Sequence, residues 1–96
     1  MKEIAEKNDH YRRTFSCKVV MTIGVAHSKD RALILEKVRN FYEFTKSNDP
    51  RDEHDFGNFE VEGTKYFFKF DYLDKNFEFY EEDGRRVLTI MRADEY

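Results

Sequence analysis

The most regular pattern along the chain is an alternation of side-chain character over residues 64–72. A period of two is typical of a β-strand, because successive side chains point to opposite faces of a sheet. Three further strands are predicted at 58–62, at 76–80 with Phe77 and Phe79 facing inward, and at 86–92. Short turns separate these four runs, and the sequence therefore predicts an antiparallel meander.

The first half of the chain shows two helical patterns with a strand between them. A thin apolar stripe predicts a helix over 2–14, and apolar residues at helical spacing predict a second over 28–46. The residues between them, 17–25, are rich in β-branched side chains and predict a strand. We therefore expect a single α+β domain over 1–96 with two layers, in which two helices pack on a mostly antiparallel sheet of about five strands.

Composition narrows the class of protein. The 96 residues hold a single cysteine, Cys17, which excludes an internal disulfide framework and a cysteine-based zinc site. We expect it to be a packed thiol. No apolar run approaches the roughly 20 residues that span a bilayer, and the N-terminus lacks the apolar core of a signal peptide. We therefore expect a soluble protein of the bacterial cytoplasm that is a monomer and holds no cofactor.

Several kinds of site find no support in the sequence. No GxxxxGK[ST] or GxGxxG motif is present, and none of the serines lies in a GxSxG setting. The aromatic and lysine-containing run at 64–72 resembles a single-strand nucleic-acid platform only superficially, because the acidic residues around it would repel phosphate. We expect its Tyr66, Phe68 and Phe70 to form the core face beneath the helices.

The densest group of chemically active side chains lies at 49–55. Carboxylates beside an imidazole can hold a divalent metal or act as a general base. The metal candidates are Asp52, His54 and Asp55. An acid–base centre would consist of Glu53, His54 and Asp55, with Lys69 and Asp71 as partners that contact these three residues. The alternative is a turn in which aspartates bond to backbone N–H groups, and the residues alone leave both open.

Charge is distributed unevenly along the chain. Residues 1–48 hold 10 Lys and Arg against 6 Asp and Glu, whereas residues 49–96 hold 7 against 14, which gives +4 and −7 and sums to the net charge of −3. Six carboxylates crowd into thirteen residues and are the predicted partner-binding set. They are Asp71, Asp74, Glu78, Glu81, Glu82 and Asp83. Such a patch can imitate a phosphate backbone and occupy a basic surface, and its simpler role is solubility.

Five motifs taken together resemble an uncharacterised bacterial family found on mobile elements. They are NDxxRxTF at 8–15, NDP at 48–50, EHDFG at 53–57, KxDYxD at 69–74 and RVLTIMxAxEY at 86–96. The chain departs from the family at Leu73, where a tyrosine is usual, and in a shorter, more acidic segment before Arg86.

The resemblance implies a function class without a mechanism. Small acidic proteins carried on mobile elements are similar to anti-CRISPR proteins, some of which mimic DNA in their charge layout. This implies an inhibitor, not an enzyme, that binds the basic groove of a CRISPR effector complex such as type I-F and blocks target DNA. The alternatives are a metal-dependent or acid–base enzyme at Glu53, His54 and Asp55, or a regulatory or toxin–antitoxin module.

Overall fold

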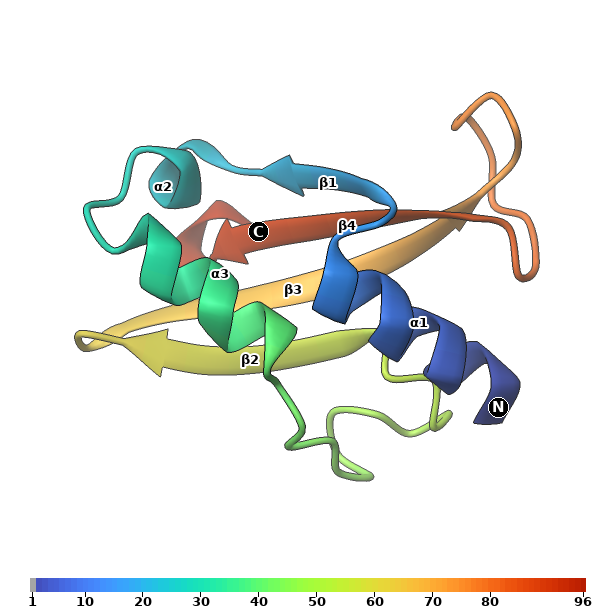
Figure 1. The fold of residues 1–96 in the computed structure, drawn as a ribbon, viewed down its shortest axis with the longest axis horizontal. Helices are drawn as coiled ribbons and strands as arrows, with labels where there is room; N and C mark the ends of the chain where they lie inside the picture. Colours follow the sequence, from blue (N-terminus) through green and yellow to red (C-terminus); the bar gives the residue numbers. More distant parts are fainter. Residues whose placement is uncertain (1) are drawn as a thin grey trace.

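The computed structural model describes residues 2–96, and its elements form one four-stranded mixed sheet with helices before and between the strands (Figure 1). The strand order is β1-β4-β3-β2, with β1 parallel to β4 and the other neighbours antiparallel. The elements are α1 (Lys2–Thr14), β1 (Lys18–Met21), α2 (Ile23–Ala26), α3 (Arg31–Arg39), β2 (Phe56–Val61), β3 (Thr64–Leu73), β4 (Arg85–Arg92) and the 3₁₀ turn η1 (Ala93–Glu95).

The core follows the alternation that the sequence showed. The even-numbered residues of β3 pair with the core-facing residues of β4, for example Phe68 with Ile90. Val25 of α2 and Ile34 and Val38 of α3 belong to the same buried cluster as these strand residues. Figure 1 shows α1 and α3 in front of the sheet, so the helices supply the apolar side chains that cover this face.

The predicted α+β class and the helix at 2–14 are confirmed, but the number of strands is four, and not about five. The segment 76–80 is not a strand. Asp74 accepts hydrogen bonds from the backbone N–H groups of Asn76 and Glu78, at 3.0 and 3.1 Å, and this folds the chain into a turn. Phe79, predicted to face inward, is 69% exposed.

The strand predicted at 17–25 ends at Met21, and a short helix follows at once. The Glu95 carboxylate causes this change, because it accepts hydrogen bonds from the Thr22 hydroxyl and the Gly24 N–H, both at 2.6 Å. A Cβ atom at Gly24 would overlap that carboxylate, so a larger residue here would displace the Glu95 side chain from these hydrogen bonds.

The helix predicted at 28–46 is shorter and ends at Arg39. Arg12 of α1 donates to the carbonyl oxygens of Val38 and Phe41, at 3.0 and 2.9 Å, and satisfies acceptors that end the helix. The following residues turn inward, where Phe41 and Phe44 pack edge-on against Phe68. Within residues 2–96, no helix is long and apolar enough to cross a membrane.

Candidate functional site

The predicted partner-binding residues lie in or beside the connection between β3 and β4. We call residues 74–84 the acidic loop, and Figure 1 shows that it projects beyond the end of the sheet. Asp71 precedes it on β3 and bonds to Lys69 at 3.2 Å. Asp74 holds the turn described above. Two of the six carboxylates are therefore engaged before the tip of the loop is reached.

A third carboxylate, that of Asp83, is neutralised by two cations. Lys7 of α1 and Arg86 of β4 each approach it at 2.7 Å. Their hydrogen bonds, that of Lys7 first, lower the pKa of Asp83 below its usual value. Three of the six predicted partner-binding carboxylates therefore have partners within the protein, and partner binding by the set stays a prediction.

The other three carboxylates remain exposed at the tip. In the part of the chain that the structure describes, the side chains of Glu78, Glu81 and Glu82 form no hydrogen bond or ion pair. Between them lie Phe79 and Tyr80, which are 69% and 71% exposed. Paired exposed aromatic rings are unusual on a surface that contacts only water, so the acidic loop combines charge with apolar area.

The second cluster lies on the segment 40–55, between α3 and β2. Asp49 is buried, and its carboxylate accepts the backbone N–H groups of Glu53 at 2.9 Å and His54 at 3.1 Å. These bonds fold residues 49–54 into a compact turn, in which Asp52 and His54 adopt positive φ angles of 55°. The predicted structural role of an aspartate in this turn is thus confirmed for Asp49.

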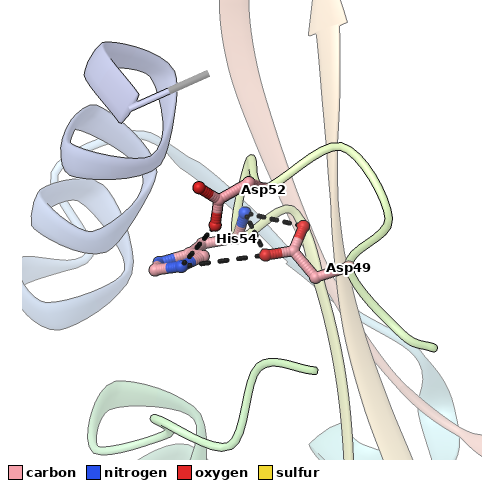
Figure 2. A group of neighbouring side chains, drawn as sticks. All are labelled: Asp49, Asp52 and His54. Atoms are coloured by element: carbon pink, nitrogen blue, oxygen red, sulfur yellow. Dashed lines mark hydrogen bonds and ion pairs between the residues drawn. The ribbon is translucent and has the colours of Figure 1, made fainter. Parts of the chain in front are cut away.

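The imidazole of His54 is held from three sides. Its ring stacks on that of Phe44 at 4.0 Å between centroids, and its Nδ1 lies 3.0 Å from the Asp9 carboxylate of α1. Figure 2 shows its Nε2 facing Asp49 and Asp52, each with a carboxylate oxygen at 3.7 Å. We call Asp49, Asp52 and His54 the His54 cluster, and one ligand atom of each lies within 4.8 Å of the others.

Asp9 connects this cluster to the core. It accepts a hydrogen bond from Arg12 at 2.8 Å as well as facing His54. Burial raises the pKa of Asp9, but the hydrogen bonds from Arg12 and His54 outweigh burial, and its pKa lies below the usual value. In the tautomer that donates from Nδ1 to the Asp9 carboxylate, the lone pair of Nε2 faces the cluster.

The predicted acid–base centre is differently composed. Glu53 turns away from His54 and accepts a hydrogen bond from the Tyr72 hydroxyl at 2.9 Å. Asp55 is not part of the group of possible metal ligands, and burial, followed by the charge of Glu53, raises its pKa. Lys69 and Asp71 pair with each other on the face of the sheet opposite to the core residues of β3. Of the three predicted metal candidates, Asp52 and His54 come together and Asp55 does not.

A cavity of about 520 Å³ adjoins the His54 cluster and is lined by Phe44, Thr45, Lys46 and Pro50 in addition to the cluster itself. The sequence did not indicate that Asp9 completes this site, because Asp9 lies 45 residues away on another element. Its one signal was the position of Asp9 inside the NDxxRxTF motif.

The thiol of Cys17 is partly buried. Burial raises the pKa of this thiol, which lies directly before β1 and packs against the core cluster. A raised pKa keeps the thiol protonated and unreactive, in agreement with the packed role expected from the sequence.

Comparison with known proteins identifies a family. No curated protein and no solved structure matches the chain. The sequence model of DUF3768, described as a protein of unknown function, matches residues 19–95. Both the acidic loop and the His54 cluster lie inside the match, whereas Asp9 precedes it. Because the match covers well over half of the sequence, the chain belongs to the DUF3768 family, as the predicted membership of an uncharacterised family required.

Proposed function

We propose that this chain is an inhibitory binding protein, and not an enzyme, whose acidic loop occupies a basic nucleic-acid-binding surface of a partner. The observation that carries the proposal is the tip of the loop, where three glutamates without partners among residues 2–96 flank the exposed Phe79 and Tyr80. Carboxylates steer association with a basic surface, and aromatic side chains that enter a pocket supply most of the affinity of an interface.

The contact differs from a pure phosphate mimic. A mimic would use all six carboxylates of the predicted set, but Asp71, Asp74 and Asp83 are engaged inside the protein. The charged part of the contact therefore reduces to Glu78, Glu81 and Glu82, and the apolar part to the two aromatic rings. Such a contact depends on salt, but less steeply than one made of charges alone.

The expected similarity to anti-CRISPR proteins indicates where to look for the partner. Anti-CRISPR proteins act in the cytoplasm of a bacterial host, and a type I-F surveillance complex offers a basic groove for target DNA. We expect one monomer of this chain to bind such a groove without a cofactor.

Neutralising the tip of the acidic loop is expected to weaken inhibition about tenfold at low salt. The variant is Glu78→Gln, Glu81→Gln and Glu82→Gln, and the measurement is competition with fluorescent target DNA for the surveillance complex at several salt concentrations. The charge-matched control is Glu36→Gln, Glu43→Gln and Glu62→Gln, three exposed positions on α3, on the segment after it and on the β2–β3 turn. The proposal is wrong if the wild-type chain does not compete, or if the loop variant competes as well as the control.

A second candidate function rests on the His54 cluster. One imidazole nitrogen and two carboxylates are a common donor set for divalent cations such as Mn²⁺, Co²⁺ and Zn²⁺. Three ligands from the protein would leave positions for water or substrate, and the adjoining cavity of about 520 Å³ gives them room. This candidate keeps the metal-dependent enzyme class open, with Asp49 in place of Asp55.

Mn²⁺ added to the chain is expected to broaden NMR signals from residues around His54, and His54→Ala should lower the affinity at least about tenfold. His27→Ala serves as the control because His27 is exposed on another element. Asp52→Asn tests the same site at an exposed position, in case His54→Ala disturbs the turn. Broadening centred on the acidic loop would contradict this candidate.

A further inference from the structure

The strand β2 forms one edge of the sheet, so that one side of its backbone has no neighbouring strand. The Phe70 N–H donates to the Asp55 carbonyl at 2.9 Å, one step beyond the register that joins β2 to β3. Hydrogen-bonded pairs alternate along an antiparallel ladder. Every second residue after Asp55 therefore bonds to β3, and Asn58 and Glu60 direct their N–H and C=O groups outward. The turn at 62–63 agrees, because Glu62 and Gly63 have the positive φ angles of a two-residue hairpin.

A groove runs along this free edge. A cavity of about 550 Å³ lies between the C-terminal part of α3, the residues that follow it, and β2. We call it the edge groove. Its apolar surface comes from Leu33, Phe41, Tyr42 and Phe59, and Tyr42 is 79% exposed. The outward backbone groups of Asn58 and Glu60 belong to residues that line this same groove.

The charge of the edge groove selects its occupant. Glu36, Glu43 and Glu60 line it against a single cation, Lys37. Among residues 2–96, none of the three glutamates forms an ion pair. Pairing of two copies of β2 would bring both sets of glutamates together, which opposes self-association. A basic strand would meet complementary charge instead.

We propose that the edge groove binds an extended segment of another protein that carries lysine or arginine side chains. The segment adds to the sheet as a fifth strand beside β2, and its backbone bonds to the outward groups of Asn58 and Glu60. One set of its alternate side chains faces Tyr42 and Phe59, on the same side of the sheet as Glu36. The other set lies beside Glu60, whose side chain points to the opposite face from that of Phe59. The six residues of β2 match a segment of about six residues, roughly 20 Å long. This surface is distinct from the acidic loop and does not depend on the proposed function.

The probe is an eight-residue peptide of alternating lysine and valine, compared with one of alternating glutamate and valine. The lysine peptide is expected to bind at least about tenfold more tightly, because its side chains are attracted by the glutamates beside β2 that would repel the side chains of the glutamate peptide. Hydrogen exchange measured by NMR should show the amides of Asn58 and Glu60 slowed by the peptide. Equal affinities, or unchanged exchange at these two amides, would overturn the proposal.

Two controls locate the contact while the protein stays folded. N-methylation of the peptide on the residues that face β2 is expected to abolish binding, whereas methylation of the intervening residues leaves it. Glu36→Gln with Glu60→Gln should weaken binding about fivefold, and Glu81→Gln with Glu82→Gln should not. The reverse result would place the peptide on the acidic loop and overturn the proposal, as would slowed exchange that appears on raising the protein concentration without peptide.

Discussion

Replacing Arg12 by alanine is expected to lower the free energy of unfolding by about 3–5 kcal/mol. The Arg12 side chain has no exposed surface, and it joins Asp9 of its own helix to the carbonyl oxygens of Val38 and Phe41. Its guanidinium also lies over the rings of Phe44 and Phe68, at 5.3 and 5.6 Å. Removal would leave the Phe41 carbonyl without its Arg12 donor, and it would take one of two donors from the Val38 carbonyl and from the Asp9 carboxylate. Urea denaturation followed by circular dichroism measures the loss.

The matched control is Arg13→Ala on the neighbouring, exposed position of α1. It removes the same charge and should change the free energy of unfolding by less than about 0.5 kcal/mol. Arg12→Lys should recover only part of the stability, because an ammonium cannot reproduce the planar fork that reaches three acceptors. A loss at Arg12 no larger than that at Arg13 would mean that Arg12 does not join the helix to the core.

The strands β3 and β4 could be predicted because a single physical rule decides them. Alternation over residues 64–72 assigns each side chain to one of two faces, and the structure buries Tyr66, Phe68 and Phe70 as expected. The register between β3 and β4 then follows from apolar pairs such as Phe70 with Leu88. Local periodicity was sufficient to predict these strands, because the alternation arises from burial of one face of the sheet.

The end of α3 could not be predicted from the same kind of pattern. Apolar spacing continues past Arg39, but tertiary contacts use those residues differently: Arg12 binds the last carbonyls, and Phe41 turns toward Phe68. The strand predicted at 76–80 was wrong for a related reason, because the Asp74 carboxylate accepts two backbone N–H groups and fixes a turn there. In each place the hydrogen bonds of one side chain outweighed local propensity.

Only the part of the candidate site that is formed by residues close together in the sequence could be predicted. The run 49–55 correctly predicted that His54 belongs to the site. Proximity in sequence also selected Glu53, which bonds to Tyr72 instead, and Asp55, which is not in the group of possible metal ligands. Asp9 could not be assigned, since no periodicity relates α1 to a turn 45 residues later.

The motifs on which the resemblance rests coincide with a buried polar network. Asn8, Asp9 and Arg12 of the NDxxRxTF motif, Asp49 of the NDP motif and Tyr72 of the KxDYxD motif all make interior hydrogen bonds. These motifs are therefore explained by folding, and they say little about a partner. The acidic loop exposes Phe79 and Tyr80 instead, and a function particular to this chain is best sought there.

Replacing Asn8 by alanine is the second change with a large expected effect, about 3 kcal/mol of unfolding free energy. Asn8 has no exposed surface, donates to the Glu53 carbonyl and the Tyr72 hydroxyl, and accepts from Arg86 Nε, all at 2.9 Å. Alanine would leave the Arg86 Nε without its acceptor, beside an Nη2 that already has no partner within residues 2–96, while Nη1 keeps Asp83. A buried donor without an acceptor costs free energy, and the cost is larger when the donor belongs to a charged group.

A double-mutant cycle with Tyr72→Phe distinguishes this network from simple loss of packing. Tyr72 binds both Asn8 and Glu53, and the two substitutions should therefore be coupled by about 1 kcal/mol. Tyr72→Phe should accordingly cost less stability in the Asn8→Ala background than in the wild-type chain. Strict additivity would mean that Asn8 stabilises the fold by filling space between α1 and β3. Coupling would instead show that the polar chain from Arg86 through Asn8 to Glu53 acts as one unit, and that the turn carrying His54 is anchored through it to the core.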